Sequence, residues 1–128
     1  MEPVARVLIL DDEPVVGERL KATLERAGFF VEAFSTSREA LDRLNEESFD
    51  ILVTDLKMSG PDGLDVLQAA RNIHPDIKPV VITGFATRDT AEKVLASGAV
   101  AFLAKPFKMS RLRQLLLQLM GQPEEPEK

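Results

Sequence analysis

Short apolar runs alternate five times with segments whose apolar residues recur at helical spacing, and this alternation limits the folds open to the chain. The near-continuous apolar character of each run predicts a strand covered on both faces. Strands that alternate with helices predict a parallel sheet between two layers of helices, joined by right-handed crossovers. We therefore predict an α/β domain whose strands lie at 4–10, 30–34, 51–53, 79–82 and 100–103.

Local start and stop residues support the helices between these strands. Pro14 stands where the first helix would begin, and Gly28 stands where that helix would end. Thr36 and Glu39 have the spacing of a capping box at the start of the second helix.

Length and composition bound the class of protein. The 128 residues suit one domain, which we place at 1–121. The segment 122–128 contains two prolines and three glutamates, and we expect it to be disordered or to begin a linker. The apolar runs are too short to span a membrane, and the first residues lack the features of a signal peptide. We therefore expect a cytoplasmic protein without a membrane partner.

The residue inventory excludes most types of catalytic site. Since the sequence has no cysteine, thiolate metal sites and cysteine nucleophiles are excluded. The one histidine, His74, precedes Pro75 at a helix end, and we expect it to be exposed and not to be a ligand. The net charge of −5 argues against direct binding of nucleic acid. Carboxylates, hydroxyls and lysines must therefore carry any chemistry.

Polar residues stand at the ends of four of the predicted strands. Asp11 and Asp12 follow the first strand, Asp55 follows the third, Thr83 the fourth and Lys105 the fifth. In an open parallel sheet the ligand crevice lies beyond the carboxyl ends of the strands. If these four strands are neighbours, all of these side chains converge on one site.

The chemistry of such a cluster follows from its charges. Three adjacent carboxylates repel one another, so at neutral pH they need a cation, and hard oxygen ligands favour Mg²⁺. A carboxylate such as that of Asp55 can act as a covalent nucleophile and form an aspartyl-phosphate. Transfer of a phosphoryl group requires neutralisation of its charge, which the Lys105 ammonium could supply, and the Thr83 hydroxyl could donate to a phosphoryl oxygen.

These residues belong to four short motifs, each of which follows the expected strand. The motifs are Leu10-Asp11-Asp12-Glu13-Pro14, Asp55-Leu56-Lys57-Met58 with Asp62-Gly63, Thr83-Gly84 and Lys105-Pro106-Phe107. On these motifs the chain resembles the response regulator receiver domain of bacterial two-component systems, and among these the receivers attached to transcription-activating ATPases. The resemblance spans roughly residues 4–120. It implies a flavodoxin-like, doubly wound (βα)5 fold with five parallel strands in the order 2-1-3-4-5.

The resemblance implies a role for each site residue. Asp55 would accept a phosphoryl group, and Thr83 and Lys105 would hold that group. Mg²⁺ would be held by the side chains of Asp11, Asp12 and Asp55 and by the Lys57 backbone carbonyl. The domain would catalyse its own phosphorylation and a slow dephosphorylation, without being a conventional enzyme.

The resemblance also implies a switch and partners. The Lys105–Pro106 bond would be cis, and Thr83 and Phe102 would move together on phosphorylation. Their movement would alter the face formed by the helix around 91–95, the strand 100–103 and the last helix. A sensor histidine kinase or a phosphotransfer protein would supply the phosphoryl group, and the same face could form a homodimer.

Several alternatives remain open from the sequence alone. Phe102 could be a core residue without a switching role. The chain could be a degenerate receiver that binds partners without phosphorylation, although no acidic residue or lysine of the motifs is lost. A phosphatase with an aspartyl nucleophile would commonly have a second Asp two residues after Asp55, where this sequence has Lys57.

The last helix departs from the family pattern at its start. Lys108 stands where an acidic cap is common, and a lysine is unfavourable at a helix N-terminus, so we expect Ser110 to cap the helix. A leucine stripe from Leu112 to Leu119 is expected to face the core. Leu117 and Met120 lie beside this stripe and could extend it into a dimer face.

Overall fold

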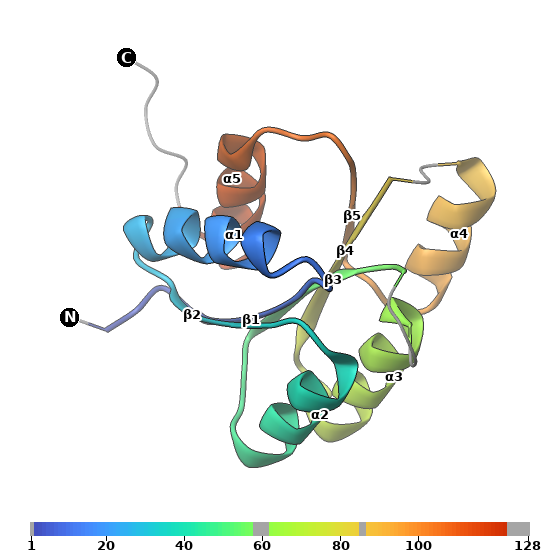
Figure 1. Ribbon diagram of the computed structural model, residues 1–128, viewed down its shortest axis with the longest axis horizontal. Coiled ribbons are helices and arrows are strands. Elements are labelled where there is room, and N and C mark those ends of the chain that lie inside the picture. The colour runs from blue at the N-terminus through green and yellow to red at the C-terminus, as the bar shows by residue number, and fades with distance from the viewer. Residues whose placement is uncertain (1, 58–61, 85–86, 123–128) are drawn as a thin grey trace.

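The computed structural model describes residues 2–57, 62–84 and 87–122, which form a five-stranded sheet and five helices in alternation (Figure 1). The strands are β1 (Arg6–Leu10), β2 (Phe30–Phe34), β3 (Ile51–Asp55), β4 (Lys78–Thr83) and β5 (Ala101–Ala104). The helices are α1 (Pro14–Arg26), α2 (Ser37–Glu46), α3 (Gly63–Ile73), α4 (Arg88–Ala96) and α5 (Met109–Leu119).

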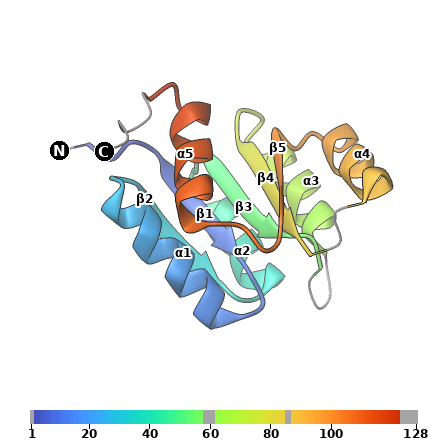
Figure 2. The same cartoon turned by 90° about the horizontal axis from the view of Figure 1, so that it is seen from above.

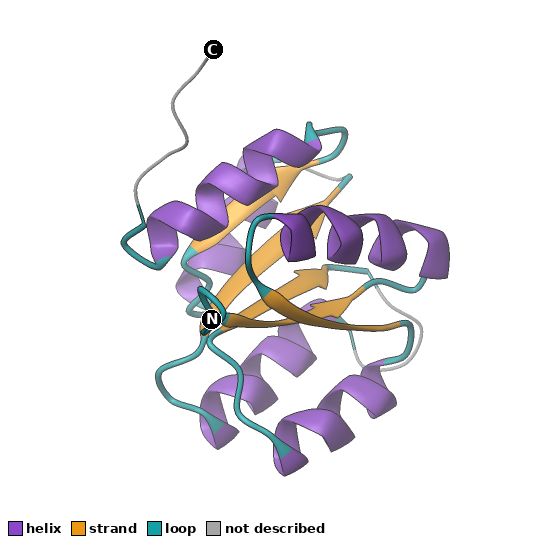
Figure 3. Cartoon of the chain, turned by 90° about the vertical axis from the view of Figure 1, so that its left-hand side faces the viewer, coloured by secondary structure: helices purple, strands orange, loops and turns teal. Residues whose placement is uncertain are grey.

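The sheet topology confirms the predicted order. All strand pairs are parallel, and the strands lie in the order β2-β1-β3-β4-β5. Helices α1 and α5 cover one face of the sheet, and α2, α3 and α4 cover the other face (Figures 2 and 3). Since β1, β3, β4 and β5 are consecutive neighbours, the residues at their carboxyl ends share one edge of the sheet.

The core divides between the two faces because side chains alternate along each strand. Val7 and Ile9 of β1 lie in the cluster under α1 and α5, whereas Leu8 and Leu10 lie in a second cluster under α2 and α3. A third and smaller cluster lies under α4 and consists of the buried residues Leu67, Val81, Val94 and Ala99. The near-continuous apolar runs of the sequence are therefore explained by burial on both faces.

β2 has the predicted bounds, and the other four strands differ from theirs by one or two residues. β1 begins at Arg6 rather than at Val4, although the Val4 N–H still donates to the Gly28 carbonyl before β2 (2.9 Å). β3 and β4 continue to Asp55 and Thr83, because these residues still pair with the neighbouring strands. Both polar residues thus belong to strands and not to loops.

The helix starts agree with the sequence at α1 and α2. Pro14 is the first residue of α1, and Gly28, with φ of 97°, follows the end of that helix. The Thr36 hydroxyl oxygen accepts a hydrogen bond from the Glu39 N–H (3.2 Å), and the hydroxyl donates to the Glu39 carboxylate (2.9 Å). Thr36 thus caps the N-terminus of α2 and stabilises its first turn.

The predicted start of α5 is wrong. The helix begins at Met109, and Lys108 occupies the N-cap position without a capping hydrogen bond from its side chain. Ser110 lies inside the first turn, so it does not cap the helix. Leu117 is buried in the first core cluster, and Met120 packs partly against that cluster. These two residues therefore contribute to the core, and the predicted extension of a dimer face through Leu117 is also wrong.

His74 is not the exposed residue that we expected. It caps the end of α3, and its ring nitrogen Nε2 lies 2.7 Å from the Leu44 carbonyl oxygen and 3.1 Å from the Glu47 carbonyl oxygen. Both carbonyls belong to the end of α2. The imidazole thus joins the ends of two helices that are distant in the sequence, which the sequence could not reveal.

The end of α4 is held against α3 by a second contact between helices. The Ser97 carbonyl accepts hydrogen bonds from Gln68 Nε2 (3.3 Å) and Arg71 Nη1 (3.2 Å). Gly98 follows with φ of 105°, and a Cβ there would lie 2.6 Å from Arg71 Cζ. A side chain at position 98 would displace the guanidinium from the Ser97 carbonyl.

Two expectations fall on residues outside the described ranges. Met58, the last residue of the Asp55-Leu56-Lys57-Met58 motif, lies in the segment 58–61, and the predicted tail lies in 123–128 apart from its first residue. Within residues 2–57, 62–84 and 87–122, no helix has the length and apolar character needed to cross a membrane.

Candidate functional site

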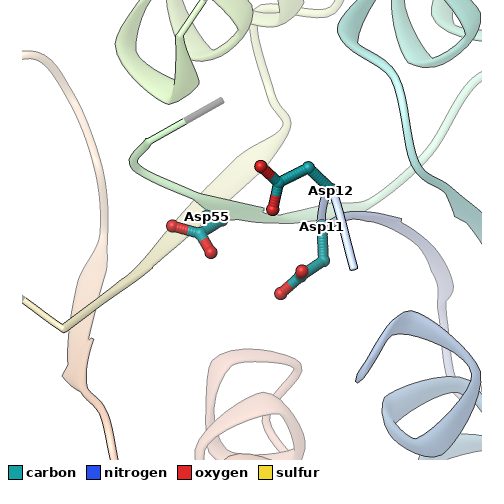
Figure 4. Close-up of side chains that lie close together, drawn as sticks. All are labelled: Asp11, Asp12 and Asp55. Atoms are coloured by element: carbon teal, nitrogen blue, oxygen red, sulfur yellow. The ribbon is translucent and has the colours of Figure 1, made fainter. Parts of the chain in front are cut away.

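Three aspartates gather at the carboxyl edge of the sheet (Figure 4). Asp11 and Asp12 follow β1, and Asp55 ends the neighbouring strand β3, where Leu10 pairs with Thr54. One carboxylate oxygen from each aspartate lies within 4.8 Å of the others. The predicted convergence of these residues is therefore present, and the three side chains could share one cation.

The chain turns sharply after β1 because of Asp11. Its Oδ1 accepts a hydrogen bond from the Glu13 N–H (2.9 Å), which is the geometry of an Asx turn and leads into α1 at Pro14. The Asp11 side chain is only 3% exposed, whereas Asp12 is exposed. The hydrogen bond from the Glu13 N–H thus fixes the Asp11 side chain, whereas the Asp12 side chain is exposed to solvent.

Both oxygens of Asp55 have hydrogen-bond donors. Oδ1 accepts from the Lys57 N–H (3.1 Å), and Oδ2 accepts from Lys105 Nζ (2.9 Å). The side chain is 13% exposed, so it is held in one orientation yet stays accessible from the edge of the sheet. The predicted use of the Lys57 carbonyl as a metal ligand remains a prediction.

Lys105 is positioned by the end of β5. Its N–H donates to the Thr83 carbonyl (2.8 Å), and the Lys105–Pro106 peptide bond is cis. From there Nζ reaches Asp55 and lies 3.6 Å from Asp11 Oδ2. One ammonium group thus bridges two of the three carboxylates.

Burial and charge shift the acid–base properties of two of these groups. Burial raises the pKa of Asp11, and the Glu13 N–H and the Lys105 charge oppose this only in part. Burial alone would lower the pKa of Lys105, but its hydrogen bond to Asp55 and the negative charges of Asp55 and Asp11 outweigh this effect and raise it. Lys105 is therefore a cation at neutral pH. It lies beside Asp11, whose carboxylate charge is destabilised by burial.

The strand register places Thr83 beside these groups. Thr83 ends β4 and pairs with Ala104, the residue before Lys105, and Asp55 pairs with Ile82, the residue before Thr83. Thr83 is 1% exposed. Its place at the same edge agrees with the sequence analysis, and its role as a phosphoryl ligand remains a prediction.

Phe102 lies on β5 two residues before Ala104, further from the site. It pairs with Val81 across the β4–β5 ladder, is partly buried and packs against the third core cluster. This environment suits both a core residue and a side chain that changes its position. A switching role of Phe102 therefore remains a prediction.

The sequence analysis missed two contacts on the Asp55 backbone. The Thr54 hydroxyl donates to the Asp55 carbonyl (2.9 Å), and Gly63, the first residue of α3, packs directly on that carbonyl. A Cβ at position 63 would collide with the Asp55 oxygen and lie 2.8 Å from Leu56 Cα, while the Gly63 N–H donates to the Leu56 carbonyl (2.9 Å). The Asp62-Gly63 pair was recognised as a motif, but this close approach depends on tertiary packing and could not be predicted from it.

The donor set fits a hard divalent cation. Three carboxylates supply oxygen ligands, and no imidazole or thiolate lies among the potential ligands in the described part of the chain. The buried Asp11 charge beside Asp12 and Asp55 is destabilising without a counterion, and the Lys105 ammonium offsets only part of it. The residues present would therefore hold an ion such as Mg²⁺.

Comparison with known proteins assigns the family. Residues 7–117 match the response regulator receiver domain. The response regulator protein PilR of Pseudomonas aeruginosa is 37% identical over 87% of this chain and 25% of its own length. The response regulator receiver protein CpdR of Brucella abortus is 36% identical over 84% of this chain and 89% of its own length.

Solved structures give the same result. A CheY-like response regulator receiver domain from Methanospirillum hungatei has a TM-score of 0.87 and 27% identity, covering 94% of this chain and 95% of that chain. The beryllofluoride-activated NtrC4 receiver domain dimer has a TM-score of 0.79 and 38% identity, covering 88% of this chain and 91% of that chain. The chain spans a quarter of the length of PilR and of the C4-dicarboxylate transport regulator DctD of Rhizobium meliloti (25% each).

Proposed function

Because the chain belongs to the response regulator receiver family of two-component systems, we propose that Asp55 accepts a phosphoryl group and thereby switches the domain. The observation that carries this proposal is the environment of the Asp55 carboxylate. Lys105 and the Lys57 N–H hold its two oxygens, and Asp11 and Asp12 offer the oxygens of a cation site beside it. A carboxylate with these neighbours is equipped for phosphoryl transfer.

The proposed reaction is a displacement at phosphorus. An Asp55 carboxylate oxygen forms a bond to the phosphorus atom, and the bond from phosphorus to the donor breaks, with its electron pair leaving on the donor. The Lys105 ammonium neutralises charge on the transferred group, and the Thr83 hydroxyl donates to one of its oxygens. When bound by Asp11, Asp12, Asp55 and the Lys57 carbonyl, Mg²⁺ would supply further charge neutralisation.

Intact mass tests this proposal directly. The chain and its Asp55→Asn variant are incubated with Mg²⁺ and a small acyl phosphate, and we expect one added phosphoryl group on the parent and none on the variant. Addition to both proteins would place the acceptor elsewhere. No addition to a folded parent protein would favour a degenerate receiver that acts by binding alone, although every acidic residue and the lysine of the site are present.

We propose that the phosphoryl donor in the cell is a cytoplasmic histidine kinase or phosphotransfer protein. Val15, in the first turn of α1 next to the acidic site, is 67% exposed and forms an apolar surface with Pro14 and Ala22. Such a surface suits a protein partner better than a small donor. Val15→Asp should slow transfer from the kinase and leave phosphorylation by the acyl phosphate unchanged.

The switch is proposed to involve Thr83 and Phe102, which lie on adjacent strands. Its proposed output is the face of α4, β5 and α5, where Leu95 is 50% and Val100 is 46% exposed. This face is also the proposed homodimer interface, and the NtrC4 receiver, which was solved as an activated dimer, supports that assignment. We propose residues 1–121 as the receiver, and the segment expected to be a disordered tail or the start of a linker lies outside the described residues apart from Gln122.

A further inference from the structure

A pocket of about 350 Å³ lies between the start of α3 and α4, beside the site of the three aspartates. Its floor is apolar: Val94 is fully buried in the third core cluster, and Leu56 and Leu64 pack against that cluster while partly exposed. The volume is at the small end of the range for enclosed ligand sites. The pocket therefore suits one or two anchoring side chains better than a cofactor.

The rim of this pocket is positively charged. Lys57, which follows β3, and Lys93, on α4, both line it, and Thr90 adds a hydroxyl. The rim has one carboxylate, Asp62, but its Oδ1 accepts the N–H groups of Leu64 and Asp65 (3.0 Å each) at the α3 N-terminus, which offsets its charge. Lys93 forms no ion pair with another residue in the described ranges.

We propose that this α3–α4 pocket is a docking site for an acidic segment of a partner protein that inserts one apolar side chain. The apolar side chain would lie against Leu64 and Val94, and flanking carboxylates would pair with Lys57 and Lys93. Charge complementarity selects this occupant, since an apolar floor between two ammonium groups disfavours a basic or uncharged segment. A nucleic acid is disfavoured because two lysines make too few phosphate contacts in a chain of net charge −5.

The pocket shares a wall with the acidic site. Leu56 and Lys57 directly follow Asp55, and the Lys57 N–H that holds Asp55 Oδ1 belongs to the residue whose side chain lines the pocket. The Leu56 N–H is in turn bonded to the Ile82 carbonyl (2.9 Å). Modification of Asp55 Oδ1 would remove the hydrogen bond that ties Lys57 to the acidic site, so occupancy of the pocket and modification of Asp55 are coupled through Lys57. This coupling rests on the proposed function, whereas docking does not.

Docking is tested on the unmodified, ¹⁵N-labelled chain by NMR titration with the blocked peptide acetyl-Glu-Leu-Phe-Glu-amide. Its matched control is acetyl-Lys-Leu-Phe-Lys-amide. We expect saturable shifts of the Leu64, Thr90 and Lys93 amides with the acidic peptide only. Lys93→Glu should weaken binding about tenfold, which is about 1.4 kcal/mol. The matched variant Lys21→Glu, on α1, should bind like the parent.

Three results of this titration would overturn the docking site. They are the absence of shifts at these amides, equal binding of the two peptides, and an unchanged dissociation constant for Lys93→Glu.

Coupling is tested by repeating the titration with Mg²⁺ and an acyl phosphate, on the parent and on Asp55→Asn. A changed dissociation constant in the parent alone supports the coupling. An unchanged constant in a parent whose mass has increased by one phosphoryl group overturns the coupling and leaves docking intact. No increase in mass would instead refute phosphorylation, and the coupling with it.

Discussion

Lys105 Nζ lies 2.9 Å from Asp55 Oδ2, and the same nitrogen lies 3.6 Å from Asp11 Oδ2. One ammonium group is therefore shared by the carboxylate proposed to react and a carboxylate proposed to bind metal. A charge in this place can stabilise Asp55 before transfer and the phosphoryl oxygens after it. The raised pKa of Lys105 keeps this charge in place at neutral pH.

We expect Lys105→Met to slow phosphorylation of Asp55 by about 10²-fold, the typical effect of removing one charge-stabilising donor. Time-resolved intact mass with an acyl phosphate and Mg²⁺ measures this rate. Lys108→Met removes an exposed lysine from the same segment and should leave the rate unchanged. If Lys105→Met reacted as fast as the parent, Lys105 would have no part in the transfer.

Asp11→Asn should stabilise the metal-free domain and abolish its response to Mg²⁺. The Asp11 carboxylate is 3% exposed and close to two others, so its charge is costly without a cation. In the parent, free Mg²⁺ at about 100 times its Kd should add about 2.7 kcal/mol of stability. Thermal unfolding with and without Mg²⁺ measures both effects, and Asp42→Asn, an exposed site on α2, is the control. A melting temperature of Asp11→Asn that still rose with Mg²⁺ would exclude Asp11 as a ligand.

Gly63→Ala should lower the free energy of unfolding by about 1–3 kcal/mol, because the added Cβ overlaps the Asp55 backbone carbonyl. It should also slow phosphorylation by displacing Asp55. Urea denaturation and intact mass provide the two readouts. Gly84→Ala is the matched control, since a Cβ there has nothing within 4 Å. Equal stability of the two variants would show that α3 can move away from Asp55 freely.

Phe102→Ala should leave phosphorylation of Asp55 largely intact and weaken the conformational response. Phe102 packs against the third cluster under α4, outside the carboxylate group. Hydrogen exchange of α4 and β5, with and without acyl phosphate, measures the response. Loss of phosphorylation in a folded Phe102→Ala domain would contradict the assigned role.

Stability should fall in acid partly through Glu32. Arg43 donates to both Glu32 oxygens (Nε–Oε1 2.7 Å, Nη2–Oε2 3.0 Å), and this contact holds the pKa of Glu32 below its ordinary value of 4.5. Between the folded and the unfolded pKa of Glu32, the unfolded chain binds more protons than the folded chain. The contribution of Glu32 to stability is therefore present above pH 4.5 and is lost as the pH falls through the folded pKa. Urea midpoints of the parent and Glu32→Gln should converge at low pH. If the difference between the two urea midpoints were the same at every pH, stability would not be linked to protonation of Glu32.

The fold and the gathering of the site residues could be predicted from local patterns. Five apolar runs between helical segments determined the layers, and strand ends determined where Asp11, Asp55 and Lys105 would meet. The topology itself came from the family resemblance, because alternation alone does not fix which strands are neighbours.

The wrong or missed predictions concern residues whose environment depends on contacts between elements that are distant in the sequence. The environment of His74 depends on the ends of α2 and α3 lying side by side, and that of Gly63 depends on the depth at which α3 meets β3. Local propensity also misplaced the start of α5, where Lys108 is an N-cap without a side-chain bond. Burial of Leu117 and Leu112 holds this helix in place despite the poor cap.

The His74 contact has a mechanical consequence. Because one imidazole nitrogen faces the Leu44 and Glu47 carbonyls, α2 and α3 cannot slide past each other without losing both contacts. The two helices therefore resist sliding relative to each other and behave as one unit on this face of the sheet. Helix α4 is held against α3 at its C-terminal end through Ser97, and Thr90, Lys93 and Val94 of α4 line the α3–α4 pocket. A displacement of α4 that kept the Ser97 contacts would therefore be a rotation about its C-terminal end, and it would change the width of the pocket.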